Sequence, residues 1–389
     1  MKKQIGVLTA TRAEFGLLKP LIIRLFRENC FDTKVLVTGA HLSPAFGYTY
    51  KEIEEAGIPI AKKIACVTDA DTPQGICNNM AMAMTGFAQY FSSNRLDLLI
   101  VLGDRYETMA VCIAAMNAGI PIAHIHGGEA TEGLIDEAIR HSITKMSQIH
   151  FASTQVYSKR IIQMGEQPDR VFHVGALAVE NIKNNDFVSK ETLGEELGIS
   201  LDGKYGVVTF HPVTLEESSG MEQFEQLLYA LEKFPDMSFI ITKANADAGG
   251  RKINKRIDEY AEKHSNIAAV TSLGARRYLS AVKESAAVIG NSSSGIIEAP
   301  CLQVPTVNIG DRQKGRLMPE SVLCCEPESF AIEETIQKAV SDDFHRKVQS
   351  MKNPFGNGET SEKIVHILKS VFVREGRIGI VKKFYDIGV

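Results

Sequence analysis

Ionisable side chains gather between residues 96 and 141, where two apolar runs each end in charged or imidazole groups. The run 98–102 is followed by Gly103, Asp104 and Arg105, and the run 120–123 is followed by HIHGGE, residues 124–129. Buried parallel strands deliver the residues that follow them to one edge of a sheet. Carboxylates and imidazoles gathered there could exchange protons with a substrate. The candidate catalytic residues are Asp104, His126, Glu129, Asp136 and Glu137.

Two other interpretations of this cluster are open. An unpaired carboxylate at a buried strand end costs free energy, so Asp104 should either pair with a cation or take part in the chemistry. Arg105 could simply be its partner. The H-x-H pattern with a nearby carboxylate could bind zinc. Against zinc, we expect His124 to be covered by a helix and only His126 to emerge into a cleft. Arg105 and Arg140 lie near Asp104 and Asp136 in the sequence, which suits hydrogen-bonded carboxylates better than metal ligands, so we predict no metal. Arg105 and Arg140 are also candidates for binding substrate.

A second set of polar residues lies in AVIGNSSSGIIE, residues 287–298. A strand ends there, a serine-rich turn follows and a helix begins, so backbone N–H groups and hydroxyls could bind an anion. The alternative is an ordinary serine N-cap. The turn 310–316, after the next strand, adds three cations and favours a nucleoside diphosphate. We expect Glu298, on the first turn of the helix, to accept hydrogen bonds from ribose hydroxyls. The residues predicted to bind substrate here are Asn291, Ser292, Ser293, Ser294, Gly295, Glu298, Arg312 and Arg316.

Four further residues at strand ends are weaker candidates. His211 ends the strand VVTF and could donate to a phosphate, or could cap a turn before Pro212. Arg12 follows the first strand and could reach the same phosphates, or could be a solvated arginine at a helix start. Asn245 and Asp247 are possible base or ribose contacts.

The composition bounds the function. With 389 residues, 44% hydrophobic and 23% charged, the chain is typical of a soluble protein of two domains. A net charge of -4 predicts neither nucleic acid nor a membrane surface as partner. The seven scattered cysteines are an odd number without a CxxC pair, which favours reduced thiols in a cytoplasmic protein. The glycine loops that bind nicotinamide cofactors or ATP are missing, so we predict no cofactor.

Strand and helix alternate along the chain, which predicts α/β structure with two doubly wound parallel sheets. We place the first domain at 1–178 and the second at 179–360, with a polar linker carrying a short helix at 181–203. A C-terminal segment, 361–389, could pack back on the first domain. The expected strands are 4–8, 34–37, 58–64, 98–102, 120–123, 149–152, 171–174, 206–210, 238–242, 267–270, 286–289 and 306–309.

Seven motifs carry a resemblance to a known family. They are TATRAEFGLL, VLGDRYE, HIHGGEATEGLIDEAIRHSITKMS, FHPVT, NADAGG, GNSSSGIIEAP and NIGDRQKGR. In this order, from the first strand to about residue 355, the chain resembles the hydrolysing UDP-N-acetylglucosamine 2-epimerases of the bacterial sialic acid type and their legionaminic-acid-pathway relatives. The resemblance implies two Rossmann-like domains in a glycosyltransferase-B arrangement, with the substrate in the crevice between them. It also implies no metal, no nicotinamide and a homodimer or homotetramer.

The resemblance also assigns roles to residues. Asp104 and Asp136 match the family's catalytic carboxylates, while non-hydrolysing epimerases have a glutamate where this chain has His126, which keeps Glu129 in consideration. The residues that match nucleotide and diphosphate contacts are Arg12, His211, Ser292, Ser293, Glu298 and Arg312. The implied reaction releases a free 2-epimer and a nucleoside diphosphate through a 2-acetamidoglucal.

Several alternatives remain open at this point. They are a non-hydrolysing epimerase, a glycosyltransferase of the same architecture, and a sugar-nucleotide-binding regulator without catalysis. Within the first hypothesis, the base could be UDP or GDP, and the sugar N-acetylglucosamine or 2,4-diacetamido-2,4,6-trideoxyglucose. The sequence does not decide which residue is the acid and which is the base.

Overall fold

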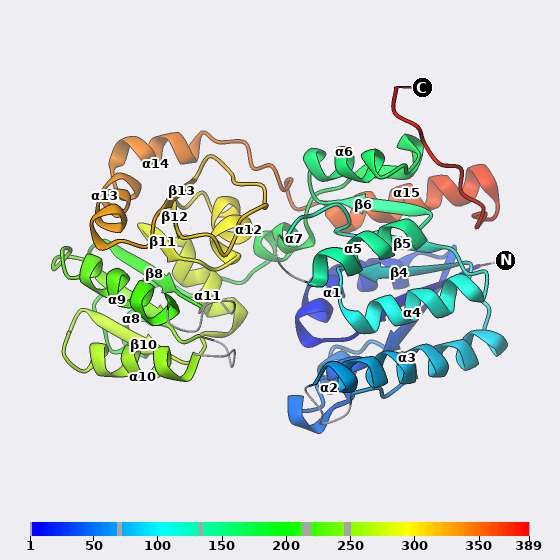
Figure 1. The fold of residues 1–389 in the computed structure, drawn as a ribbon, viewed down its shortest axis with the longest axis horizontal. Coiled ribbons are helices and arrows are strands. Elements are labelled where there is room, and N and C mark those ends of the chain that lie inside the picture. The colour runs from blue at the N-terminus through cyan, green and yellow to red at the C-terminus, as the bar shows by residue number, and fades with distance from the viewer. Residues whose placement is uncertain (1, 68–71, 132–134, 212–218, 245–249, 389) are drawn as a thin grey trace. The chain divides into compact units, whose positions relative to one another are not determined.

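The computed structural model describes residues 2–67, 72–131, 135–211, 219–244 and 250–388. The chain divides into two compact units, which are described separately (Figure 1). Unit 1 comprises Met1–Asn181 and Phe355–Val389, and unit 2 comprises Ile182–Pro354. In the described ranges, no helix is both long and apolar enough to cross a membrane.

Unit 1 is built on a seven-stranded parallel sheet with the strand order β3-β2-β1-β4-β5-β6-β7. Its strands are β1 (Lys3–Thr9), β2 (Phe31–Val37), β3 (Ile60–Lys63), β4 (Leu98–Leu102), β5 (Ile122–Ile125), β6 (Ile149–Ala152) and β7 (Val171–His173). Its helices are α1 (Arg12–Arg27), α2 (Tyr50–Glu55), α3 (Pro73–Ser93), α4 (Tyr106–Asn117), α5 (Ile135–Met146), α6 (Gln155–Gln163), α7 (Leu177–Lys183) and α15 (Thr360–Glu375). Three short 3₁₀ turns lie at 39–42, 44–46 and 168–170.

The strands of unit 1 bury both faces, which is why they are apolar runs and not alternating patterns. Val7 and Ile100 belong to the core that α1 and α15 cover, whereas Leu8 and Val101 belong to the opposite core with α3, α4 and α5. Figure 1 shows α3, α4 and α5 lying along one side of this sheet. Helices on both faces leave the carboxyl edge of the sheet as the place where side chains can meet a ligand.

Unit 2 has a six-stranded parallel sheet with the order β10-β9-β8-β11-β12-β13. Its strands are β8 (Tyr205–Thr209), β9 (Ser238–Thr242), β10 (Ile267–Val270), β11 (Ala287–Gly290), β12 (Thr306–Ile309) and β13 (Val322–Cys325). Its helices are α8 (Lys190–Leu197), α9 (Ser219–Leu231), α10 (Gly250–Ala261), α11 (Gly274–Lys283), α12 (Ser294–Cys301), α13 (Ser329–Ala339) and α14 (Asp342–Gln349). Val208 faces the core beneath α9, α10 and α13, and Val207 faces the core beneath α8, α11 and α12.

The predicted pair of doubly wound parallel sheets is confirmed. Five expected strands have the predicted bounds, namely β4, β6, β9, β10 and β12. Helix α4 was not predicted, because its buried residues, among them Ala110, Val111, Ala114 and Ala115, leave no alternation between apolar and polar faces. The expected strand 120–123 lies two residues later, as β5, so His124 belongs to the strand itself.

Candidate active site

The strand order of each sheet reverses direction once, between β1 and β4 in unit 1 and between β8 and β11 in unit 2. Doubly wound sheets bind ligands outside the carboxyl ends of strands at such switch points. The predicted residues of unit 1 follow β1, β4 and β5, and those of unit 2 follow β8, β11 and β12. Each unit therefore presents its candidate residues at the edge where this fold places ligands.

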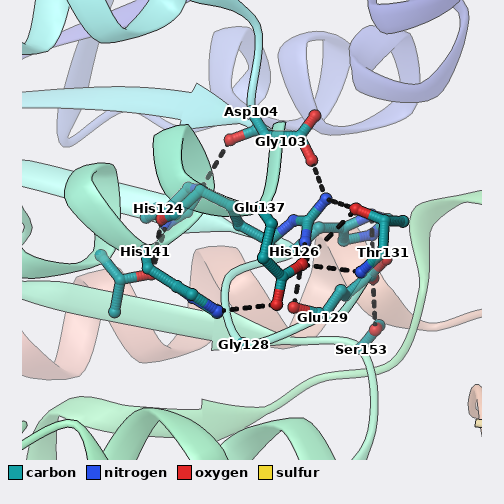
Figure 2. Close-up of polar contacts among 12 residues, drawn as sticks. Gly103, Asp104, His124, His126, Gly128, Glu129, Thr131, Glu137, His141 and Ser153 are labelled. Carbon is teal, nitrogen blue, oxygen red and sulfur yellow. Dashed lines mark hydrogen bonds and ion pairs between the residues drawn. The ribbon is translucent and has the colours of Figure 1, made fainter. Parts of the chain in front are cut away.

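Arg140, on α5, is the centre of the polar cluster in unit 1. Its side chain is only 4% exposed, and its guanidinium forms an ion pair with Asp104. It also donates to Glu137 Oε2 at 2.8 Å, to the Glu129 carbonyl at 3.0 Å and to Thr131 Oγ1 at 3.0 Å. Figure 2 shows these groups converging from the loops after β4 and β5 and from α5. Both terminal nitrogens of the guanidinium are thus engaged within unit 1, which favours a positioning role for Arg140, and its predicted contact with substrate stays a prediction.

The hypothesis that Arg105 is the partner of Asp104 is wrong. Arg105 turns to the fully buried Glu107 and donates to both of its oxygens, at 3.1 and 3.0 Å. Asp104 instead pairs with Arg140, from a helix 36 positions further along the chain. Adjacent residues at the end of a strand point to different sides, so sequence neighbours are poor candidates for ion pairs there.

Asp136 and Glu137 are neighbours on α5 but differ in proton affinity. Burial raises the pKa of Asp136, and the negative charge of Asp104 raises it further. Burial would also raise the pKa of Glu137, but hydrogen bonds from the Thr131 N–H and His141, together with the charge of Arg140, hold it below its usual value. Two carboxylates whose environments separate their pKa values are typical of acid and base roles. Asp136 is the one suited to carry a proton.

His126 and Glu129 lie in the loop after β5. His126 has a left-handed backbone, with φ of 65°, and its Nδ1 lies 3.6 Å from Glu129 Oε1. The other ring nitrogen, Nε2, has no hydrogen-bond partner among the described residues. Glu129 Oε1 also accepts from Ser153 Oγ at 2.8 Å. A strained backbone and a buried imidazole nitrogen without a hydrogen-bond partner among the described residues are both features that occur at ligand sites.

His124 is fully buried, as expected. Its Nε2 lies 2.8 Å from the Gly103 carbonyl and its Nδ1 lies 3.3 Å from Thr144 Oγ1, so the carbonyl contact makes Nε2 the protonated nitrogen. Burial lowers the pKa of His124 to about 3, which leaves the ring neutral. Within the described part of the chain, no group of three or more His, Cys, Asp and Glu side chains is placed to hold a metal ion.

In unit 2, Asn291 joins the loops that follow β8, β11 and β12. Its Oδ1 accepts from the His211 N–H and its Nδ2 donates to the His211 carbonyl, both at 2.8 Å. Its own carbonyl accepts from Arg312 Nη1 at 3.1 Å and from Gln313 Nε2 at 2.8 Å. Asn291 is buried and uses all of these groups internally. It therefore holds His211 and Arg312 at one edge of the sheet.

The serine turn begins α12. Ser293 is its N-cap residue and makes no side-chain capping bond, but Ser292 Oγ accepts from the Ser294 N–H at 3.4 Å, so the alternative of an ordinary serine cap stays open. Ser292 and Ser293 are partly exposed, while Ser294 donates to Glu298 Oε2 at 2.5 Å. Because α12 begins at Ser294, Glu298 lies one turn further along than predicted. Burial raises the pKa of Glu298, although the Ser294 hydrogen bond opposes this.

The remaining predicted residues differ in their surroundings. Arg12 is 72% exposed and pairs with Glu52 at 2.9 Å. Arg316 is partly exposed. Gly295 lies against Thr306, so that a Cβ would be 2.6 Å from its methyl group, which makes this glycine a packing residue between α12 and β12. Asn245 and Asp247 lie outside the described residues.

Comparison with known proteins now places the chain. The family model described as UDP-N-acetylglucosamine 2-epimerase matches residues 24–369. The chain belongs to this family. It is 41% identical, over 88% of its length and 89% of the relative, to the GDP/UDP-N,N'-diacetylbacillosamine 2-epimerase (hydrolyzing) of Campylobacter jejuni. It is 39% identical, over 99% and 98%, to the polysialic acid biosynthesis protein P7 of Escherichia coli.

The fold of this 2-epimerase family member has solved counterparts. The crystal structure of UDP-GlcNAc 2-epimerase from Neisseria meningitidis bound to UDP-GlcNAc superposes with a TM-score of 0.75 at 19% identity. It covers 94% of this chain and 100% of that one. This likeness confirms the glycosyltransferase-B-like architecture expected from the sequence.

The 2-epimerase site also contains residues that the sequence analysis missed. Glu14, on α1, accepts from the N–H groups of Ala10 and Thr11 at 2.7 and 2.9 Å, and burial raises its pKa to about 7. The pattern Thr11-x-x-Glu14 is a capping box and could have marked this residue. Glu107, which pairs with Arg105, gave no signal because it lies in an apolar helix that was not predicted.

Proposed function

We propose that the chain is a hydrolysing nucleoside-diphosphate-sugar 2-epimerase. In this reaction a nucleotide-linked 2-acetamido sugar and water yield the free 2-epimer and the nucleoside diphosphate. The observation that carries the proposal is the set Asp104, Arg140 and Asp136, because it joins an ion-paired carboxylate to a second carboxylate with a raised pKa. The name of the relative at 41% identity supports the same activity, and the name of the relative at 39% identity supports a role in nonulosonic acid biosynthesis.

The first half of the reaction needs a leaving group and a base. The C2 proton of an N-acetylhexosamine is hardly acidic, since no carbonyl is adjacent. When the bond from C1 to the diphosphate oxygen breaks, C1 acquires oxocarbenium character and the C2 proton becomes acidic. We assign the base to Asp104, whose ion pair with Arg140 holds its side chain at this edge of the sheet. The electron pair of the C2–H bond then forms the double bond of 2-acetamidoglucal, and the nucleoside diphosphate leaves.

The second half needs an acid and water. A proton must reach C2 from the opposite face while the oxygen of water bonds to C1, which gives the inverted free sugar. The proton that water loses restores the acid, and the base releases the proton from C2 to solvent. We assign the acid to Asp136, because its raised pKa favours the protonated carboxyl group. We assign His126 as a third group, because its buried Nε2 has no hydrogen-bond partner among the described residues and could accept or donate a hydrogen bond to a sugar oxygen. Glu129 contacts His126 at 3.6 Å and is assigned a positioning role, as is Glu137.

Unit 2 would hold the nucleoside diphosphate. Ser292 and Ser293 at the start of α12 offer hydroxyls at the positive end of a helix, and Arg312 adds a cation held by the Asn291 carbonyl. His211 lies beside them because Asn291 bonds both sides of its peptide. Glu298 is suited to accept hydrogen bonds from ribose hydroxyls. These donors would also stabilise the charge that develops on the leaving diphosphate.

The decisive experiment is a donor panel in deuterated water followed by proton NMR. The panel contains UDP-N-acetylglucosamine and the UDP and GDP forms of 2,4-diacetamido-2,4,6-trideoxyglucose. Release of the free 2-epimer with deuterium at C2, together with nucleoside diphosphate, is the expected result for one of them. Release of the sugar without inversion or deuterium would contradict the proposal, as would an epimer that stays attached to the nucleotide.

The other hypotheses gain less support. A glycosyltransferase would also need an acceptor, so turnover of the donor with water alone would count against it. A non-catalytic regulator would bind the nucleotide sugar and leave it intact. The relative of higher identity carries the word hydrolyzing in its name, which favours release of free sugar over a non-hydrolysing epimerase.

Two broader expectations remain part of the proposal. All seven cysteines are free thiols, which supports a cytoplasmic enzyme. A homodimer or homotetramer is expected from the family resemblance, and size-exclusion chromatography with light scattering would test it.

A further inference from the structure

The segment after α15 lies on unit 1 and is anchored at several points. The ring of Phe384 covers Gly165 so closely that a Cβ at this glycine would be 2.3 Å from it. The N–H of Tyr385 donates to the Gly165 carbonyl at 2.9 Å, and Gln167 Nε2 donates to the Lys383 carbonyl at 3.3 Å. Residues 380–388, called here the tail, are thus tied to the loop between α6 and β7.

These anchors bring Lys382 to the end of α5. Its Nζ donates to the carbonyls of Thr144, Lys145 and Ser147 at 3.4, 2.9 and 2.6 Å. Carbonyls in the last turn of a helix have no partner within the helix, and they form the negative end of its dipole. Lys382 therefore caps α5 with a positive charge supplied from the far end of the chain.

The same ammonium group enters a buried ion network. Lys382 Nζ lies 2.5 Å from Glu166 Oε2, which also accepts from His150 Nε2 at 3.0 Å, while Glu166 Oε1 accepts from Lys145 Nζ at 2.6 Å. Burial would raise the pKa of Glu166, but these three partners lower it to about 2. The carboxylate is thus a fixed anion, and it holds Lys382 and Lys145 together at the end of α5.

The ion network lies beside residues that contact the candidate active site, although within the described residues its side-chain hydrogen bonds end at His150. His150, on β6, stands opposite His124 on β5 in the sheet. His124 binds the Gly103 carbonyl, next to Asp104, and contacts the side chain of Thr144, whose carbonyl binds Lys382. Helix α5 is therefore held from two sides, by Arg140 toward Asp104 and by Lys382 at its last turn.

We propose that Lys382 is a positioning residue for the reaction, which fixes α5 and through it the geometry of Asp136 and Arg140 relative to Asp104. The tail is then a built-in support of the catalytic carboxylates. This inference rests on the proposed function for its kinetic consequence, although the docking of the tail does not. Lys382 touches no candidate substrate group, so its effect must pass through α5.

The test compares full-length variants. Lys382→Met removes the positive charge and keeps a side chain of similar length, and Lys382→Arg keeps a positive charge at this position. Lys383→Met is the matched control, because the Lys383 side chain is exposed and, within the described residues, the contact that Lys383 makes is through its backbone carbonyl. Phe384→Ser releases the tail anchor at a side chain that is 64% exposed, and so keeps the test interpretable if Lys382→Met folds poorly.

Turnover is measured per nucleotide-binding site, which is counted by titration with the nucleoside diphosphate. We expect Lys382→Met to lower kcat about 10- to 100-fold, since small displacements of catalytic groups have effects of this size. The affinity for the nucleoside diphosphate should change by less than about twofold, because the residues proposed to bind it lie in unit 2. Lys382→Arg should keep most of the wild-type kcat, and Lys383→Met should have the wild-type kcat. The kcat of Phe384→Ser should lie between those of Lys382→Met and the wild type.

A purely structural role would lower the number of binding sites or the Tm and leave kcat per site unchanged, and that result would overturn the proposal. Equal effects of Lys382→Met and Lys383→Met would also overturn it. Hydrogen exchange of the α5 amides separates this failure from failure of the proposed function. Faster exchange in residues 140–147 of Lys382→Met is expected even if no donor of the panel is turned over, and unchanged exchange would refute the support of α5.

Discussion

The sharpest test of the acid/base assignment compares the two neighbouring carboxylates of α5. Asp136→Asn replaces a group whose pKa is raised by burial and by Asp104, so the neutral amide removes the transferable proton but little favourable charge. We expect kcat to fall about 100- to 10,000-fold, the usual contribution of a general acid. The free energy of unfolding should change by less than about 1 kcal/mol. The wild-type rate should decline as pH rises through the raised pKa.

Glu137→Gln is the matched control and should behave in the opposite way. The Glu137 carboxylate accepts from the Thr131 N–H at 2.7 Å and from Arg140 at 2.8 Å. When Glu137 loses its charge, Asp104 is the anionic partner that Arg140 keeps among these contacts. A hydrogen bond to a charged group is worth about 1.5–3 kcal/mol, so we expect a loss near 2 kcal/mol. For a domain of this size the Tm should fall by about 4–8 °C.

Both variants are assayed by release of nucleoside diphosphate and by deuterium incorporation at C2, and their stability is measured by differential scanning calorimetry. Nucleotide affinity should stay unchanged in each, since the proposed diphosphate contacts lie in unit 2. Asp136→Asn that retains turnover within about tenfold of the wild type would refute the assignment of Asp136 as acid. A variant Glu137→Gln that is as stable as the wild type would refute the structural role given to Glu137.

Three further predictions concern stability. The folded pKa of His124, about 3, lies below its usual 6.5, so the unfolded chain binds the proton more tightly and stability is lost as pH falls through 6.5. Unfolding in urea should show a loss of about 2 kcal/mol from this residue between pH 7.5 and 5, and His124→Gln should remove that part of the pH dependence. Glu14 has the opposite sign, because its folded pKa of about 7 lies above its usual 4.5 and stability is lost as pH rises through this interval. Relative to the wild type, Glu14→Gln should therefore gain about 2 kcal/mol between pH 5 and 8, and equal pH curves would contradict the burial argument. Gly290→Ala places a Cβ 2.0 Å from the Thr209 carbonyl at a φ of 132°, so unit 2 should lose at least about 3 kcal/mol and calorimetric titration should show weaker UDP binding.

The sequence was informative wherever local chemistry sets the structure. The run 98–102 is uniformly apolar and ends at a glycine, so both the bounds of β4 and the placement of Asp104 just after it could be predicted. The burial of His124 followed from the same reasoning, since this residue follows the apolar run directly, whereas the emergence of His126 into a cleft stays a prediction.

The sequence was uninformative where a residue's partner comes from another element. Adjacency made Arg105 an open alternative as the partner of Asp104, but the Arg105 guanidinium pairs with Glu107, at the start of the helix that follows β4. The capping of α5 by Lys382 joins residues more than 200 positions apart. No periodicity or spacing carries such information, because it depends on how the tail crosses the finished fold.

The position of Arg140 changes how the chemistry of the site is understood. As a substrate contact, it would leave the charges of Asp104 and Asp136 to be set by the ligand. As a buried residue bonded to Asp104, Glu137, Thr131 and the Glu129 carbonyl, it fixes those charges before any ligand arrives. The pKa of Asp136 is then raised by burial and by an Asp104 charge that the protein itself holds in place. Two carboxylates of the same kind can thereby serve as base and acid, because only one of them has the arginine as its direct partner.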